Sequence, residues 1–326
     1  MSAPAPEPST APVDHRPVPG GAARPVATVP DERWLGLWPS GQAPVEVVLW
    51  DMTGPAPVEP SLVVTPYLDS GEVLQQLGRV PSLRVVQTLT AGYEGVLPHL
   101  PPGVVLCNAG GVHDASTAEL AVGLAIAGLR GLGDFARAQT AGRWLHGTRP
   151  ALADRSVLLL GAGGVGAAVA RRLAAFEVRL TRVASRDRVD EFGRVHAVSH
   201  LPQLLPDHDV VILTLPLLET TRGLVDAGFL AAMPDGALLV NVARGPIVVT
   251  DALVAELATG RLSAALDVTD PEPLPAGHPL WTAPNVLISP HVGGDTSAFP
   301  PRARALLRDQ FGRFAAGEPL LNVVTG

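Results

Sequence analysis

The chain has 326 residues, which is long enough for two domains of ordinary size. Hydrophobic residues make up 47% of it and charged residues 17%, a composition typical of a globular protein with a sizeable core. A net charge of −7 and an isoelectric point near 5.7 disfavour nucleic acids and anionic membranes as partners. The chain has no lysine, which excludes Schiff-base enzymes, pyridoxal enzymes and P-loop nucleotide hydrolases, because each needs a lysine amine.

The cysteine content and the start of the chain bear on the compartment. Cys107 is the single cysteine, so no intrachain disulfide is possible and a reducing compartment is favoured. The first residues lack the basic-then-apolar order of a signal peptide, and no apolar run is long enough to span a bilayer. We therefore expect a cytoplasmic protein.

The first part of the chain predicts a small α/β domain. Residues 1–30 are rich in Pro, Ala and Gly and are expected to form a disordered tail, with structure beginning near Trp34. Apolar runs separated by helical patterns, such as 71–77, then indicate alternating strands and helices, which is typical of a parallel sheet. The strands are expected at 45–50, 62–65, 83–89 and 104–107.

A long apolar helix is expected next, over Ser116–Arg130, because Ser-Thr-Ala-Glu at its start matches a capping box. The most informative segment follows. Val157–Leu160 predicts a strand, and Val165–Ala175 predicts a helix. The turn between them has the spacing G-x-G-x-x-G.

The three spaced glycines of this turn are typical of a dinucleotide-binding site. Gly161 would allow the tight turn, Gly163 would let the backbone approach a pyrophosphate, and Gly166 would let the helix pack on the strand. The phosphates would lie at the helix N-terminus, where free N–H groups and the helix dipole favour anions. The alternative is a tight strand-to-helix turn without a ligand.

Five further strands follow the glycine turn, as expected for a doubly wound nucleotide-binding domain over residues 114–294. A final helix, at about 301–316, is expected to return to the first domain. The first domain would then comprise residues 31–113 plus 295–326, with the nucleotide-binding domain inserted in it. The five strands are expected at 178–184, 210–215, 237–242, 264–268 and 286–288.

Arg244, Glu272 and His291 each follow one of these strands, and ligands bind beyond the carboxyl ends of strands in such sheets. An arginine fork suits the carboxylate and carbonyl oxygens of a 2-keto acid. A histidine can exchange the proton that hydride transfer to a carbonyl requires, and a carboxylate on its other nitrogen raises its pKa. Taken singly, these residues could equally be a surface arginine, a solvated loop glutamate and a packed histidine.

With these motifs the chain resembles the D-isomer-specific 2-hydroxyacid dehydrogenase family, from about Leu83 to Val324. The glycine turn, Leu215–Leu224, Asn241–Gly245, Ala265–Pro273 and Pro290–Gly294 carry the resemblance. It implies a flavodoxin-like substrate domain, an inserted Rossmann domain, an active site in the cleft and a homodimer. Formate dehydrogenases of this fold have glutamine where Glu272 stands, so that activity is set aside.

The resemblance also implies roles for individual residues. Arg244 would bind substrate, His291 would be the acid/base supported by Glu272, and the N–H groups at Ala91 and Gly92 would hold the substrate carboxylate. Asp267 would contact the nicotinamide amide. Together with the glycine turn, the expected cofactor contacts are Gly161, Gly163, Gly164, Val165, Gly166, Ser185, Arg186, Leu215, Pro216, Val242, Ala243, Asp267 and Gly294.

Ser185 and Arg186 stand where an acid would bind the ribose hydroxyls of NAD, so we expect a slight preference for NADPH over NADH. A one-residue shift would place Asp187 there instead. The expected reaction is reduction of a small 2-keto acid such as glyoxylate or hydroxypyruvate. The alternative is an NAD(H)-binding sensing protein without turnover. No hydrolase motif and no metal site are expected.

Overall fold

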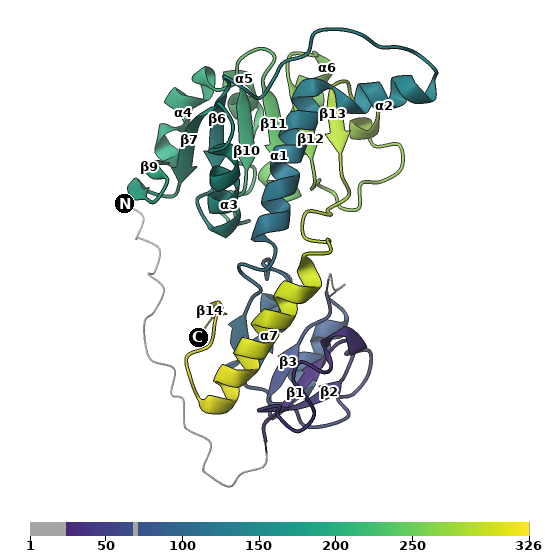
Figure 1. The fold of residues 1–326 in the computed structure, drawn as a ribbon, viewed down its shortest axis with the longest axis vertical. Coiled ribbons are helices and arrows are strands. Elements are labelled where there is room, and N and C mark those ends of the chain that lie inside the picture. Colours follow the sequence, from purple (N-terminus) through teal and green to yellow (C-terminus); the bar gives the residue numbers. More distant parts are fainter. Residues whose placement is uncertain (1–23, 68–70, 326) are drawn as a thin grey trace. The chain divides into compact units, whose positions relative to one another are not determined.

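The computed structural model describes residues 24–67 and 71–325, and these form two compact units. One unit contains the residues up to Val112 together with those from Ser297 onward, and the other spans His113–Thr296. Figure 1 shows both units in a ribbon coloured by residue number. Each is an α/β structure, as the sequence predicts, and each is described by itself.

The first unit is built on one sheet, which has six strands within the described residues. Five of them are parallel in the order β2-β1-β3-β4-β5, which is the flavodoxin-like order, and β14 pairs antiparallel with β5. The strands are β1 (Val26–Val29), β2 (Glu46–Leu49), β3 (Leu62–Val64), β4 (Val85–Gln87), β5 (Val105–Cys107) and β14 (Val323–Thr325).

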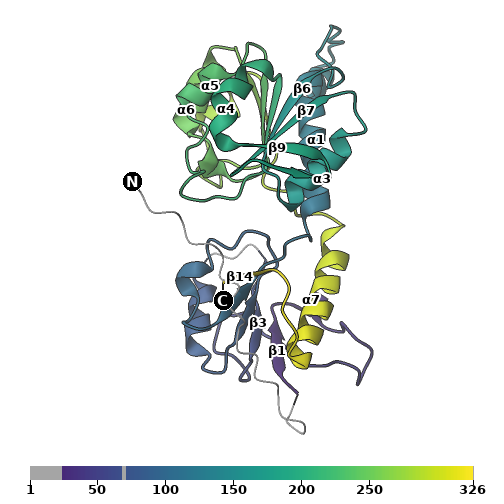
Figure 2. The ribbon, with the colours of Figure 1, turned by 90° about the vertical axis from the view of Figure 1, so that its left-hand side faces the viewer.

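Helices cover both faces of this sheet (Figure 2). The last helix, α7 (Phe299–Ala316), packs Phe311 against Leu62 and its neighbours, so it returns to the first unit as predicted. The other face, which includes Val63, packs against the 3-10 helix η2. The crossovers in this unit contain short 3-10 helices: η1 (Glu32–Trp34), η2 (Val73–Arg79) and η3 (Leu97–His99).

The predicted start of structure near Trp34 is wrong. Strand β1 begins at Val26 and lies inside the sheet, between β2 and β3, with Ala27 and Val29 fully buried. The surrounding Pro-rich composition hid this four-residue strand, whose stability comes from its two neighbours rather than from its own length. Residues 1–23 of the predicted tail lie outside the described residues. Strand β14 was not predicted either.

The second unit is a Rossmann-type sheet, with eight strands in the part of the chain that the structure describes. Their order is β13-β12-β11-β10-β6-β7-β9-β8, and all neighbours are parallel except β8 and β9. The chain order reverses beside β6, and nucleotides bind at such switch points. The strands are β6 (Ser156–Leu160), β7 (Arg179–Ala184), β8 (Arg188–Asp190), β9 (Gly193–Ala197), β10 (Val210–Leu213), β11 (Leu238–Asn241), β12 (Ser263–Leu266) and β13 (Val286–Ile288).

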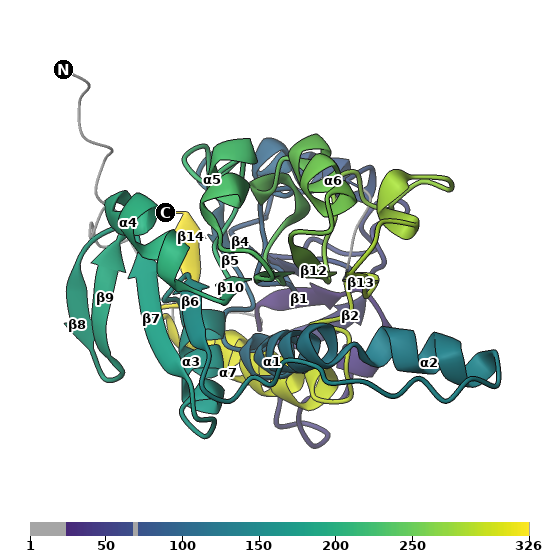
Figure 3. The ribbon, with the colours of Figure 1, turned by 90° about the horizontal axis from the view of Figure 1, so that it is seen from above.

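Helices α1 and α3 lie on one face of this sheet, and α5 and α6 lie on the other (Figure 3). Alternating side chains of the strands pack into two cores, one on each face. Val157 and Leu159 of β6 face α1 and α3, whereas Leu158 and Leu160 face α5 and α6. Both faces are buried, so the strands are apolar throughout. The helices of this unit are α1 (Asp114–Arg130), α2 (Leu132–Thr140), α3 (Gly164–Leu173), α4 (Leu201–Leu204), α5 (Ala227–Ala232) and α6 (Thr250–Ala258), with 3-10 helices η4 (Val198–His200), η5 (Leu205–Asp207), η6 (Gly245–Ile247) and η7 (Pro279–Trp281).

Two details of this unit differ from the prediction. Helix α1 begins at Asp114, and the Ser116 hydroxyl donates to the His113 carbonyl, so the predicted capping box is not the helix cap. The β8–β9 hairpin was missed because its sequence is rich in charge. It is held by Arg182, whose buried guanidinium donates to Asp190 at 2.9 Å and to the Gly193 carbonyl at 3.0 Å.

No single helix among the described residues is long and apolar enough to cross a bilayer. Helices α1 and α2 pass that test only as a pair, and they are bent by 65° relative to each other.

Candidate active site

The glycine turn after β6 has the geometry that its spacing predicts. Gly161 has φ +113°, and a Cβ on it would lie 2.5 Å from Thr214 Oγ1 and 2.7 Å from the Thr214 backbone. A Cβ on Gly166 would lie 2.0 Å from the Gly161 carbonyl oxygen. A side chain on Gly161 would push the turn away from Thr214 after β10, and one on Gly166 would push α3 away from the turn. These glycines therefore allow the close strand–helix packing of a nucleotide-binding turn.

The N-terminus of α3 offers a place for an anion. Gly163 is the N-cap and has no side chain to cap the helix, and a Cβ on Gly163 would meet no atom within 4 Å. The first N–H groups of a helix, here those of Gly164, Val165 and Gly166, have no partner within the helix. Free N–H groups, the helix dipole and open space at Gly163 together fit a pyrophosphate.

The end of β7 would lie at the ribose of a dinucleotide in this fold. Ser185 and Arg186 are exposed there. Asp187 is engaged elsewhere: its carboxylate lies 3.7 Å from Arg194 and 3.9 Å from His200 Nδ1. Arg188 donates to the carbonyl of Ala162 at 3.0 Å, so this loop contacts the glycine turn.

Arg244 is placed by a tight turn after β11. The buried Asn241 side chain accepts a hydrogen bond from the Ala243 N–H at 3.0 Å and donates to the Arg244 carbonyl at 3.1 Å. The Arg244 guanidinium donates to the Ala243 carbonyl at 2.7 Å. A Cβ on Gly245 would lie 1.8 Å from the Thr269 carbonyl oxygen, so glycine lets the Arg244 turn approach the loop that carries Glu272.

Asp267 holds the loop of His291. It is 3% exposed, and its carboxylate accepts hydrogen bonds from the Ser289 hydroxyl at 2.7 Å and from the N–H groups of Val292 and Gly293 at 2.9 Å each. These bonds were not foreseen from the sequence, because they join β12 to the segment after β13. Asp267 therefore positions the loop that carries His291. The predicted contact of Asp267 with the nicotinamide amide stays a prediction.

His291 itself adopts φ +54°, a left-handed conformation that residues other than glycine seldom take. Its N–H donates to the Asp267 carbonyl at 2.7 Å, which holds the backbone in this conformation. Its Nδ1 is hydrogen-bonded to Glu272 Oε1. An ionised carboxylate only accepts hydrogen bonds, so Nδ1 carries the hydrogen and Nε2 is the nitrogen that can exchange a proton.

The pKa values of the two side chains move apart. The hydrogen bond to Glu272 raises the pKa of His291 above its usual value, although burial and the charge of Arg244 oppose it. Burial raises the pKa of Glu272. The hydrogen bond and charge of His291, the Thr269 N–H and the charge of Arg244 lower it, and together they outweigh burial, so the net change is downward. The imidazolium–carboxylate form is therefore stabilised, and Arg244 is close enough to act on both groups.

The remaining predicted residues lie as follows. Leu215 and Pro216 follow β10, with Leu215 partly buried against the core, and Val242 and Ala243 are buried after β11. The Gly294 carbonyl is hydrogen-bonded to His113 Nδ1 at 3.2 Å. Ala91 and Gly92 belong to the first unit, in a loop after β4.

This fold and site define a nicotinamide-nucleotide dehydrogenase of the α/β class. The family model described as "D-isomer specific 2-hydroxyacid dehydrogenase, NAD binding domain" matches residues 122–293. A glyoxylate reductase of Korarchaeum cryptofilum is 30% identical over 301 residues, which cover 89% of each chain. The human glyoxylate reductase/hydroxypyruvate reductase is 33% identical over 226 residues, 66% of this chain and 69% of that one.

A solved structure is also similar. The D-isomer specific 2-hydroxyacid dehydrogenase from Xanthobacter autotrophicus Py2 in complex with NADPH and MES superimposes with a TM-score of 0.79 at 29% identity, covering 93% of this chain and 98% of that one. The chain belongs to the D-isomer specific 2-hydroxyacid dehydrogenase family, which confirms the resemblance seen in the sequence. It is an NAD(P)-dependent oxidoreductase that acts on the CH–OH group of small 2-hydroxy acids and on the corresponding 2-keto acids.

Proposed function

We propose that this enzyme reduces glyoxylate, hydroxypyruvate or a closely related small 2-keto acid to the D-2-hydroxy acid. The observation that carries the proposal is the hydrogen-bonded pair of His291 and Glu272 with the charge of Arg244 acting on both. The relatives named as glyoxylate and hydroxypyruvate reductases support the substrate class.

His291 is the proton donor in this proposal. When bound, NAD(P)H would supply the hydride for the carbonyl carbon, and the carbonyl oxygen would need a proton. His291 donates it from Nε2 while Glu272, on Nδ1, stabilises the imidazolium before the transfer and orients the ring. In the direction of oxidation the neutral imidazole takes the proton back.

In this proposal Arg244 binds the substrate, and the family resemblance implies a further contact from the N–H groups of Ala91 and Gly92. The Arg244 guanidinium can hold the carboxylate and the carbonyl oxygen of a 2-keto acid together. In the loop, the Ala91 carbonyl accepts from Asn108 at 2.7 Å and the Gly92 carbonyl accepts from Thr90 at 2.6 Å. No hydrogen bond among the described residues uses the N–H groups of Ala91 and Gly92, and these suit a substrate carboxylate.

The cofactor in this proposal is NADPH in preference to NADH. Arg186 is exposed at the end of β7, where a 2′-phosphate would lie. The Asp187 carboxylate lies 3.7 Å from Arg194 and 3.9 Å from His200. The similar structure from Xanthobacter autotrophicus contains NADPH, which supports this preference. The other contacts would come from the glycine turn, Leu215, Pro216, Val242, Ala243, Asp267 and Gly294.

A homodimer in the cytoplasm completes the proposal. Large apolar side chains are exposed on α2 and on the segment after it: Leu132 is 47%, Trp144 95% and Leu145 40% exposed. Exposed apolar patches of this kind are typical of association surfaces. A second copy of this chain is the partner that the family resemblance implies.

Cofactor oxidation at the reduced-nicotinamide band tests the proposal, with NADH and NADPH in parallel and glyoxylate, hydroxypyruvate, pyruvate and phenylpyruvate as substrates. His291→Ala is expected to lower kcat by about 10²–10⁴-fold, the usual worth of general acid catalysis. His99→Ala is the control, because His99 ends η3 and is assigned neither to the substrate nor to the cofactor. Full turnover in His291→Ala would refute the role of His291, and cofactor binding without turnover on any keto acid would favour the sensing alternative.

A further inference from the structure

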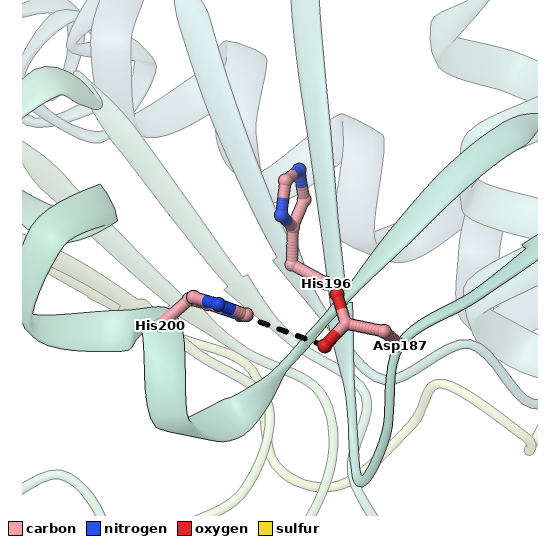
Figure 4. A group of neighbouring side chains, drawn as sticks. All are labelled: Asp187, His196 and His200. Atoms are coloured by element: carbon pink, nitrogen blue, oxygen red, sulfur yellow. Dashed lines mark ion pairs between the residues drawn. The ribbon is translucent and has the colours of Figure 1, made fainter.

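A cluster of metal-ligating side chains lies on the second unit and has no part in the reaction proposed above. Asp187 follows β7, His196 lies in β9 and His200 ends η4. One ligand atom of each lies within 4.8 Å of the others. Figure 4 shows the two imidazole rings and the carboxylate gathered beside the edge of the sheet.

One nitrogen of this cluster lacks a hydrogen-bond partner. His200 Nδ1 is buried and has no hydrogen-bond partner among the described residues. It lies 3.9 Å from Asp187 Oδ2, which is beyond hydrogen-bond distance. The rings of His196 and His200 are nearly perpendicular, with an interplanar angle of 80° and centroids 5.9 Å apart, so they do not stack. Buried nitrogens are ordinarily paired, and an ion would supply the missing partner.

We propose that Asp187, His196 and His200 bind a divalent transition-metal ion of the zinc type. Two imidazoles and one carboxylate are ligands that zinc accepts, and a water molecule would complete four-coordination. Magnesium and calcium are disfavoured because they prefer oxygen ligands throughout. No metal site was predicted from the sequence, where the spacing H-x-x-x-H at 196–200 was not recognised; a strand and a 3-10 helix carry it instead of an α-helix.

The geometry needs a modest contraction. Ligand atoms of a tetrahedral zinc site stand about 3.3 Å apart, given zinc–nitrogen bonds near 2.0 Å. Asp187 and His200 have side chains 48% and 45% exposed, so close packing does not fix either side chain in its present rotamer. The nearby cation does not block the site: Arg194 approaches Asp187 Oδ1 at 3.7 Å, whereas His200 faces Oδ2. The ion would join the loop after β7 to the β9–η4 segment and stabilise this edge of the sheet.

The test uses the full-length protein after treatment with a chelator. Zn²⁺ binding is measured by titration calorimetry, Co²⁺ binding by the visible absorption of four-coordinate cobalt, and Tm with and without Zn²⁺. The wild type is expected to bind one ion and to gain in Tm. Asp187→Asn, His196→Ala and His200→Ala are each expected to weaken binding by at least about tenfold, since losses in the support of a metal site cost 10–100-fold.

His99→Ala serves as the matched control, because it removes a histidine of the first unit, outside the cluster. It is expected to bind the ion as the wild type does. Asp187→Asn keeps the size of the side chain, so loss of binding in that variant at unchanged circular dichroism cannot come from misfolding. Equal binding in the wild type and the three cluster variants, or no binding to the wild type, would overturn the proposal.

Discussion

Replacing Gly245 by alanine tests how closely the Arg244 turn approaches the Glu272 loop. The new Cβ would lie 1.8 Å from the Thr269 carbonyl oxygen and 2.8 Å from the Asp270 nitrogen. A carbon and a carbonyl oxygen pack at about 3.3 Å, so the two backbones must separate by roughly 1.5 Å. The backbone of Gly245 is not left-handed, and crowding is therefore the whole effect.

The displacement has consequences for stability and for catalysis. Overpacking of this kind costs about 1–3 kcal/mol, which corresponds to a loss in Tm of roughly 2–12 °C for a domain of this size. Thr269 donates to Glu272 at 3.4 Å, so a shift of this loop also moves the partner of His291. Misplacement of catalytic groups by about 1 Å costs about 10²-fold, and we expect that loss mainly in kcat.

Thermal unfolding and steady-state kinetics with NADPH measure the two effects. Gly78→Ala is the matched control, since a Cβ there meets no atom within 4 Å and Gly78 is exposed in η2. If Gly245→Ala keeps both the Tm and the kcat of the control, the close approach of the two loops is wrong. A loss of Tm at full kcat would separate packing from catalysis and refute the positioning argument.

Four further outcomes are expected. The pKa of His291 is raised and its protonated form is the acid, so the rate of reduction falls as pH rises through that pKa. Glu272→Gln is expected to move this fall in rate to lower pH, and an unchanged pH profile would contradict the support of His291 by Glu272. Arg186→Ala lowers kcat/KM with NADPH but not with NADH, and equal efficiency with NADPH would reject the 2′-phosphate contact. Burial raises the pKa of Cys107 to about 12, so thiol reagents label it only after denaturation, and rapid labelling of the native protein would be inconsistent with this. Trp144→Ser weakens a dimer by at least about 30-fold in light scattering, and an unchanged dimer would place the interface elsewhere.

The sequence by itself determined the features that rest on local chemistry. The glycine turn follows from the spacing of Gly161, Gly163 and Gly166, because a tight turn and close packing tolerate few other residues. The parallel strands of the second unit other than β9 follow from their apolar runs, since a parallel sheet buries both faces. The order of Arg244, Glu272 and His291 behind that turn predicted that Glu272 supports His291, and the hydrogen bond between these two side chains agrees with it.

Only the tertiary structure decided the features that depend on partners distant in the chain. Strand β1 pairs with β2 on one side and β3 on the other, which stabilises it. The Pro-rich sequence around it does not predict a strand. The β8–β9 hairpin depends on the buried Arg182, which in sequence is one more charge. Asp267 holds a loop more than twenty residues away, and Asp187 turns toward Arg194 and His200.

The physical reason is the same in each case. Turn chemistry and hydrophobic periodicity act between neighbours in the chain, so they can be read residue by residue. Hydrogen bonds such as that of His291 with Glu272 form only after strands β12 and β13 are paired in register. Long-range pairing brings those groups within reach, and residue identity alone does not encode the distance.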